Sequence, residues 1–362
     1  AAAQLAVWSA LLLAFTYRLP GHRLRATAIE QVTHLLDADI DANQKVPAGF
    51  ALILHHTMSH EMARARPVIE RIGPLLDAPE LTALNRMNWC LFIGYHHHRT
   101  GDRSAAEQAL DQSDRIAAEH GLRQSEFISH CFRSYHCTSW WDANEGARAL
   151  DGLGAAVSDA TPMLGAQFHN ATMFVEMLRG NGPAAERHAR LAVAAANRLG
   201  APFFTVSWMS YAAGGLAMNG AFDEAEQWLD TAWAHSDNGF LVTYRPAILA
   251  TRAWVAMLRG RRDVARDHLR HMFSIGHDLQ ALAYLRNCPL IKDAVLAEAL
   301  DAGIEVPLAR QLIRKFRVPA PPRDIEGWPW PVRVRTLGTF RIEVDDEPLT
   351  FGRKTPRKPI AL

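Results

Sequence analysis

The sequence predicts an all-α protein of stacked helix pairs, followed near its C-terminal end by a short β-hairpin. Three observations lead to this prediction. Apolar residues recur at helical spacing through an Ala- and Leu-rich region. A glycine-to-alanine element returns about every 40 residues along this region. Beyond a proline-rich segment at 319–331, apolar and polar residues alternate as they do in strands.

The repeated element is a glycine followed five residues later by an alanine. Four copies are clear, and their pairs are Gly101 with Ala106, Gly180 with Ala185, Gly220 with Ala225, and Gly260 with Ala265. The same register extends to Gly21 with Ala26, His60 with Ala65, and Asp142 with Ala147. The seven alanines then lie 39, 41, 41, 38, 40 and 40 residues apart. We infer a repeat array over residues 1–276, with about seven helix pairs.

Each copy is interpreted as two helices and a tight connection. The first helix ends at the glycine, which accepts the left-handed conformation of a helix C-terminus. The second helix begins two or three residues later, with acidic residues at its start in the copy with Asp223 and Glu224. Its alanine lets the two helices approach closely. Such a hairpin cannot bury its apolar face alone, so the pairs are expected to stack into a superhelix. A plain helical bundle, the alternative, would not need a fixed register.

The remaining segments follow in order. Residues 277–318 are expected to cap the array, with a break at Pro289, a helix to about Ala302 and another over Pro307–Phe316. Residues 319–331 are predicted to be a stiff linker. In 332–362, two antiparallel strands carry Val332, Val334 and Thr336, then Phe340, Ile342 and Val344, with a turn at Asp345 and Asp346 and a third strand starting at Leu349 and Phe351.

The helical array resembles the tetratricopeptide repeat family. After Gly220, the pattern of Phe222, Ala225, Leu229 and Ala232 is similar to the second half of that repeat. The resemblance implies a right-handed superhelix. The period of about 40 exceeds the family's value of about 34, and the Trp and Tyr of the family's first helix are mostly absent. Longer repeats of this kind resemble the arms of large bacterial signal-transduction ATPases of the maltose-activator type.

The C-terminal segment resembles a second family. Its residues Thr336, Leu337, Gly338 and Phe340, then Pro348, Leu349 and Phe351, and finally Arg357, Lys358 and Pro359, are similar to the opening of the winged-helix DNA-binding domain of antibiotic-regulatory-protein-type activators. The resemblance implies a truncated domain at 332–362 that contacts DNA in the full-length protein. Alone, this segment is expected to contact DNA weakly through Arg353, Lys354, Arg357 and Lys358. A basic, disordered tail is the alternative.

Composition and motifs narrow the function classes. The net charge of +1 argues against a polyanion-binding surface over the whole chain, and the run Ala6–Phe15 is too short to span a bilayer. The four cysteines lack CxxC spacing, which favours reduced thiols and a cytoplasmic location. The chain begins with Ala1, which suggests a piece of a longer protein. An upstream ATPase module is typical of the resembling regulators, but no G-x-x-x-x-G-K-[ST] motif occurs here, so no cofactor is predicted.

No enzyme or metal site is predicted. The chain has no G-x-S-x-G motif, and His56 and His60, although one helical turn apart, are not part of an HExxH motif. A shared environment in successive repeats explains such histidines better than a metal ion does.

The candidate site is the concave wall formed by the first helices. The residues expected to converge there are Tyr95, His98, His136, Asn170 and Phe174, within a wider set that includes Arg99, Ser129, Gln167, Ser207, Ser210 and Trp254. Mixed aromatic and polar side chains suit a small effector or a partner peptide; a solvated helix face is the alternative. The predicted function is a sensor and transmission arm of a bacterial transcriptional regulator. The second hypothesis is a free-standing scaffold that binds a protein partner without a DNA role.

Overall fold

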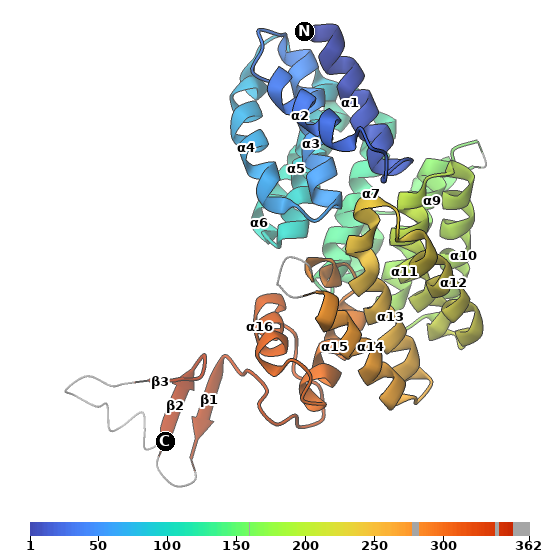
Figure 1. Ribbon diagram of the computed structural model, residues 1–362, viewed down its shortest axis with the longest axis vertical. Helices are drawn as coiled ribbons and strands as arrows, with labels where there is room; N and C mark the ends of the chain where they lie inside the picture. The colour runs from blue at the N-terminus through green and yellow to red at the C-terminus, as the bar shows by residue number, and fades with distance from the viewer. Residues whose placement is uncertain (159, 277–281, 337–339, 350–362) are drawn as a thin grey trace, which may run out of the picture. The chain divides into compact units, whose positions relative to one another are not determined.

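A computed structural model of the chain describes residues 1–158, 160–276, 282–336 and 340–349 (Figure 1). The described residues form 16 α-helices and a three-stranded antiparallel sheet. The prediction of a mostly helical chain with strands near its C-terminal end is therefore confirmed. The chain divides into two compact units, Ala1–Val295 and Leu296–Leu362. The domain limits at 276, 318 and 331 stay predictions.

The first unit contains seven pairs of helices. In chain order these are α1 (Ala2–Tyr17) and α2 (Arg25–Leu35), α3 (Ala42–Met58) and α4 (Met62–Ile72), α5 (Ala83–Thr100) and α6 (Arg103–His120), α7 (Arg123–Ser139) and α8 (Ala143–Arg148), α9 (Pro162–Leu178) and α10 (Gly182–Leu199), α11 (Pro202–Met218) and α12 (Phe222–His235), and α13 (Arg245–Leu258) and α14 (Arg262–Ile275). Four 3-10 helices accompany them: η1 (Gly73–Asp77), η2 (Leu153–Ala156), η3 (Gly239–Tyr244) and η4 (Ala283–Asn287).

The odd-numbered helices form an inner row. Each of α1, α3, α5, α7, α9 and α11 packs against the next odd-numbered helix as well as against its own partner. Helices far apart in the row are also in contact. Helix α1 packs against α11, and the ring centroids of Tyr17 and Phe204 are 5.3 Å apart. The inner row therefore brings residues far apart in the sequence around a common centre.

Left-handed residues end the first helices, as the repeat predicted. Gly101, Gly180, Gly220 and Gly260 have φ angles of 87°, 71°, 85° and 74°. Three copies differ from the glycine pattern. After α1, the capping residue Arg18 has a φ angle of −109° and Gly21 is not left-handed, so the prediction for Gly21 was wrong. His60, with φ 63°, occupies the matching place after α3, and Trp141, with φ 66°, occupies it after α7. The register had assigned that place to Asp142, which instead caps α8 by accepting a hydrogen bond from the backbone N–H of Glu145.

The small residue of each second helix is always its fourth residue, and it is buried in every pair. The predicted alanines Ala65, Ala106, Ala185, Ala225 and Ala265 occupy this position. The assignments of Ala26 and Ala147 were wrong. Ala26 is exposed and Ala28 takes its place, while Gly146 is the buried residue of α8. At Gly146 a Cβ would lie 2.9 Å from the Thr138 side chain, so the fourth pair has space for glycine alone.

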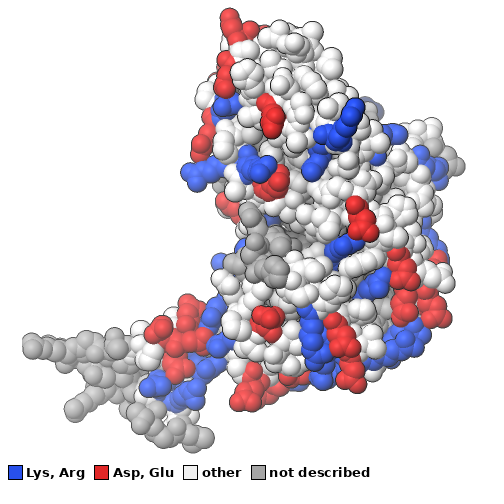
Figure 2. Space-filling model, in the orientation of Figure 1, with Lys and Arg blue, Asp and Glu red and all other residues white. Residues whose placement is uncertain are grey.

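The outer surface of the second helices is charged with both signs interspersed, as Figure 2 shows over the α12 to α14 region. Ion pairs link neighbouring helices there, such as Arg259 with Glu226 at 2.9 Å and Arg252 with Asp230 at 2.6 Å. Among the residues that the structure describes, none of the helices has the length and apolar character needed to cross a membrane.

Helix α15 (Pro289–Asp301) contains the boundary between the units, and α16 (Val306–Phe316) follows it, both close to their predicted bounds. The sheet has the order β1 (Val332–Arg335), β2 (Arg341–Val344), β3 (Glu347–Pro348), with Val332 opposite Val344 and Val334 opposite Ile342. The turn at Asp345 and Asp346 is confirmed, with both φ angles positive. Because this turn has only two residues, β3 begins at Glu347 rather than at the predicted Leu349.

The hairpin exposes its apolar residues. Val332 and Val334 are each more than half exposed, whereas Glu343 on β2 is buried against Arg333 and Arg335 of β1. The hairpin is joined to α16 through Asp346, whose carboxylate accepts hydrogen bonds from Arg310 and Arg314.

Candidate functional site

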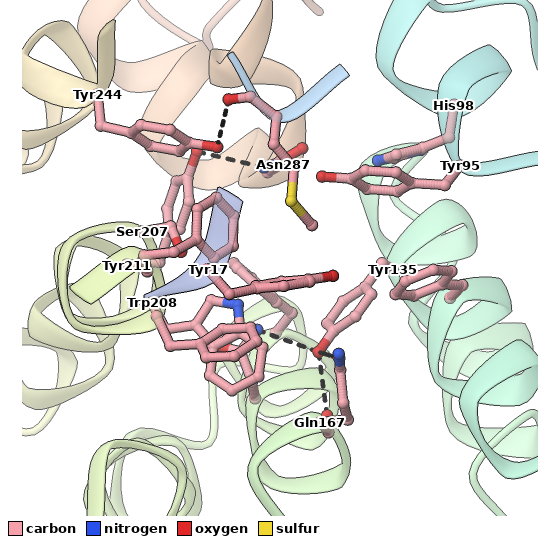
Figure 3. A pocket seen from close by; sticks show the side chains of 16 residues that line it. Tyr17, Tyr95, His98, Tyr135, Gln167, Ser207, Trp208, Tyr211, Tyr244 and Asn287 are labelled. Carbon is pink, nitrogen blue, oxygen red and sulfur yellow. Dashed lines mark hydrogen bonds between the residues drawn. The ribbon is translucent and has the colours of Figure 1, made fainter. Parts of the chain in front are cut away.

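The inner row of helices encloses a pocket lined by 16 residues (Figure 3). The lining comes from α1, α3, α5, α7, α9 and α11, together with η3 and η4. Its aromatic members are Tyr17, Tyr95, Phe132, Tyr135, Phe174, Phe203, Phe204, Trp208, Tyr211 and Tyr244. The others are Met58, His98, Gln167, Asn170, Ser207 and Asn287. Five of the chain's six tyrosines therefore face one cavity, and none of the lining residues carries a formal charge at neutral pH.

The aromatic rings form a continuous wall across four helices. Tyr95 of α5 stacks on Phe132 of α7 with ring centroids 5.1 Å apart. Tyr135 of α7 meets Phe174 of α9 edge-on at 6.0 Å, and Phe174 meets Tyr211 of α11 at 5.6 Å. Tyr95, Tyr135 and Phe174 each lie six residues before the left-handed residue that ends their helix. The wall thus arises because one repeat position is aromatic in three consecutive pairs.

A hydrogen-bond network fixes the polar side chains at one side of the pocket. The hydroxyl oxygen of Tyr135 lies 3.0 Å from both the backbone carbonyl oxygen and Oε1 of Gln167, and it accepts a hydrogen bond of 3.1 Å from Nδ2 of Asn170. Nδ2 of Asn170 donates to Tyr135, so Oδ1 of Asn170 is the polar atom of this side chain that remains without a bond in the described part of the chain. This oxygen is buried and has no hydrogen-bond partner among the described residues. Neighbouring atoms cover it, so a hydrogen-bond donor of a ligand reaches it only if a side chain shifts.

A buried arginine stands behind another side of the pocket. Arg99 is 2% exposed; its Nη1 donates to Oδ1 of Asn287 at 2.7 Å and its Nη2 to Nε2 of His60 at 3.1 Å. Within the described part of the chain, no carboxylate forms an ion pair with Arg99. Arg286 lies close to Arg99. Burial, followed by the Arg99 cation, lowers the pKa of Arg286 to about 10. Arg99 therefore places a buried positive charge next to this side of the pocket.

The tyrosines and the pocket histidine are neutral at physiological pH. Burial raises the pKa of Tyr17, Tyr95 and Tyr135, so their hydroxyl groups keep their protons. Burial, followed by the neighbouring His136, holds the pKa of His98 well below 6.5. Burial also lowers the pKa of His136.

The structure places four of the five predicted groove residues, Tyr95, His98, Asn170 and Phe174, in the pocket wall. His136 is not part of the lining. It lies behind His98, with ring centroids 5.6 Å apart, and its Nε2 is 3.5 Å from Oε1 of Glu107. In the wider set, Gln167 and Ser207 also line the pocket, whereas Ser129, Ser210 and Trp254 do not.

Several lining residues were not predicted from the sequence. Some, such as Tyr135 and Tyr211, lie on the inner helices within the repeat, and others lie on the 3-10 helices. Tyr244 belongs to η3 and its hydroxyl donates to the backbone carbonyl oxygen of Met58 at 3.1 Å. Asn287 belongs to η4, and Tyr17 ends α1. The chain has six tyrosines, and five of them line this one pocket. Their scarcity in the sequence was the available sign that they share a role.

The histidines and cysteines noted in the sequence have separate surroundings in the described part of the chain. His56 interacts with Glu61 at 3.2 Å, and His60 with Arg99, so the two histidines face different partners. Cys90, Cys131 and Cys288 are buried, and burial raises the pKa of each thiol. The basic residues Arg353, Lys354, Arg357 and Lys358 lie outside the described residues.

No protein-family model and no curated protein matches this chain.

Proposed function

We propose that the chain is the sensor and transmission arm of a bacterial transcriptional regulator. In this proposal a small effector binds in the aromatic pocket, and the region from Val332 onward belongs to a winged-helix DNA-binding domain. The observation that carries the proposal is the origin of the pocket lining. Six consecutive first helices and two 3-10 helices each contribute to one cavity. A ligand there would contact most of the array at once.

This arrangement supports transmission as well as binding. A ligand stabilises whichever relative placement of the helices offers it more contacts. Side chains from α1, α5 and α11 converge on the pocket, so a bound molecule would bias how these helices pack. We interpret the helix pairs as a tetratricopeptide-like right-handed superhelix, in which small changes between neighbouring pairs add along the array.

The C-terminal region supports the regulatory part of the proposal. Its hairpin has the strand, turn and strand order that the winged-helix resemblance implies, and its exposed apolar face is suited to packing against further chain. The ATPase module and ATP binding belong, under this proposal, to the full-length parent alone. A free-standing scaffold without a DNA role is the alternative.

The size and lining of the pocket favour a small effector over a peptide. The cavity has a volume of about 80 Å³, which is room for several water molecules or a small ligand. A ring with one or two polar substituents matches that space. An extended peptide would need a longer groove with exposed backbone partners.

The test is an inducer-dependent reporter that carries the full-length gene. Alanine variants of Tyr95, His98, His136, Asn170 and Phe174 are compared with Gln108→Ala, an exposed residue on α6. We expect the four lining variants to raise the inducer concentration for half-maximal response by about tenfold, with normal protein levels, and the control to behave like wild type. If all five variants respond normally, the arm transmits a signal that is received elsewhere.

A further inference from the structure

The pocket has flat aromatic walls. The buried cation of Arg99 lies behind one side, and the unpartnered Oδ1 of Asn170 lies at another. Arg99 is buried without a carboxylate partner among the described residues, and its Nε has no hydrogen-bond partner either. Arginine remains charged at all physiological pH values, and an uncompensated buried charge is unfavourable. An anion in the adjoining pocket would offset that charge.

Donors for such an anion are already in the wall. Figure 3 shows the hydroxyl groups of Tyr17 and Tyr95 pointing toward the open centre, and neither has a hydrogen-bond partner among the residues that the structure describes. Asn287, which accepts from Arg99 and donates to the hydroxyl of Tyr211 at 3.3 Å, connects the buried cation to the wall. Neutral phenols donate hydrogen bonds to a carboxylate without a charge penalty.

A different side of the pocket contains a hydrogen-bond acceptor without a partner among the described residues. Oδ1 of Asn170 is unpartnered, and the residue is 3% exposed. The bonds of Tyr135 to Gln167 and from Asn170 Nδ2 hold this amide in the orientation that leaves Oδ1 without a partner. Figure 3 draws Asn287 and Gln167 on different sides of the opening, so the two requirements fall on separate parts of a ligand.

We propose that the effector is a planar aromatic carboxylate with a hydroxyl or amino donor elsewhere on the ring. The ring stacks between the aromatic walls, the carboxylate lies toward Asn287 with Arg99 behind it, and the donor reaches Asn170. An aromatic cage can also hold a cation. The absence of any acidic residue from the lining and the presence of Arg99 disfavour that alternative here.

The test uses three probes of similar size whose second ring substituent is anionic, neutral or cationic: 4-hydroxybenzoate, 4-hydroxybenzamide and 4-hydroxybenzylamine. Their dissociation constants are measured by calorimetry on the purified chain. We expect the benzoate to bind about tenfold or more tightly than the amide, and the amine most weakly. Unsubstituted benzoate is expected to bind less tightly than 4-hydroxybenzoate because the donor to Asn170 is missing.

Two variants connect the charge preference to named side chains. Arg99→Gln should bring the benzoate affinity within about threefold of the amide affinity and leave the amide affinity nearly unchanged. Arg115→Gln, which removes an exposed arginine on α6, is the matched control and should change neither. Asn170→Ala should abolish the preference for 4-hydroxybenzoate over benzoate. If Arg99→Gln fails to fold, the charge series on the wild-type chain still decides the question.

Tighter binding of the amine than of the benzoate, or no binding of any probe, would overturn the inference. The inference rests on the proposed function only in taking the pocket as the effector site. Because binding is measured without DNA, the two can fail separately. A carboxylate that binds in the pocket but leaves the reporter unchanged would refute the regulatory role alone. An induced response through the pocket by a cation would refute the carboxylate alone.

Discussion

At the scale of single residues, the pocket is made by side chains that the fold forces to remain neutral. The tyrosine hydroxyls, His98 and the amide of Asn170 are all buried among apolar groups, where charged forms are unfavourable. Arg99 is the exception, and its partners, among them His60, Asn287 and Tyr211, are neutral. His60 occupies a left-handed position that other repeats give to glycine. The strain at His60 is offset by the acceptor it provides for Arg99.

Gly101 and Gly220 form a matched pair for substitution. Both end a first helix, with φ angles of 87° and 85°, so alanine is strained by about 1–2 kcal/mol at either position. A Cβ at Gly220 would meet open space, whereas one at Gly101 would meet the guanidinium of Arg286. We expect Gly101→Ala to lower the free energy of unfolding by about 1 kcal/mol more than Gly220→Ala does. Chemical denaturation of both variants measures the difference, and equal losses would place Arg286 elsewhere.

Two buried histidines predict how stability depends on pH. Burial, followed by the neighbouring His56 cation, lowers the pKa of His55 to about 3, and burial followed by His97 lowers that of His96 to about 4. Below about pH 6.5 the unfolded chain takes up protons that the folded chain refuses. The stability that these neutral histidines allow is therefore complete above about pH 6.5 and is lost as the pH falls toward their folded pKa values.

From about pH 7.5 to about pH 5.5, each of these two histidines should reduce the free energy of unfolding by about 1.4 kcal/mol. Urea unfolding at the two pH values tests this on the wild type and on the double variant His55→Gln, His96→Gln. Glutamine keeps a polar partner for Thr16 and Thr57, which bond the two rings at 2.8 and 3.0 Å. The pH effect should shrink in the double variant. An unchanged effect would mean that other groups cause it.

At the scale of elements, the fourth residue of each second helix sets how closely a helix pair can pack. Ala225 is fully buried there, so Ala225→Leu should overpack the contact between α11 and α12 and lower the free energy of unfolding by about 1–3 kcal/mol. Ala26→Leu is the control, because Ala26 is exposed on α2 although it has the same place in the sequence register. Thermal melts of the two variants should differ. Similar melting temperatures would contradict the assignment of the contact.

The link between α16 and the hairpin depends on one carboxylate. Asp346 accepts from Arg310 and Arg314 and has a φ angle of 68°, a conformation that asparagine tolerates well. Asp346→Asn therefore removes the charge and keeps the backbone. Because the ion pairs are partly exposed, the loss should be about 1 kcal/mol or less, and it should appear as faster amide exchange in β1 and β2 with α9 and α10 unchanged. Unaltered exchange in the hairpin would show that the ion pairs do not hold it.

At the scale of the whole molecule, the repeat register predicted the local structure better than the site. It located the helix ends at Gly180, Gly220 and Gly260 because a left-handed residue is a local requirement. It missed Tyr244 and Asn287 because these belong to 3-10 helices outside the register. It missed Tyr17 because the register placed Ala26 where Ala28 belongs, two residues away. Four predicted groove residues reached the pocket since they share repeat positions on the inner helices.

The second resemblance leads to a prediction about DNA. If the segment from Val332 onward contacts DNA through its basic side chains, residues 1–362 should bind DNA weakly, without sequence preference, and less at higher salt. Replacing Arg353, Lys354, Arg357 and Lys358 with glutamine should remove most of that binding. Gel shifts over a range of salt concentrations measure it. Tight, sequence-selective binding by the chain alone would contradict the prediction.

The central claim is that a small molecule binds inside the pocket formed by the inner helices, and filling the pocket tests it most directly. Ser207 lines the cavity, so Ser207→Phe would occupy part of it without changing any charge. The measurement is the dissociation constant of 4-hydroxybenzoate for wild type and Ser207→Phe, after circular dichroism has shown that both are folded. The account predicts binding weakened by about 30-fold or more in the filled variant. Equal affinities would show that the molecule binds elsewhere and would contradict the account.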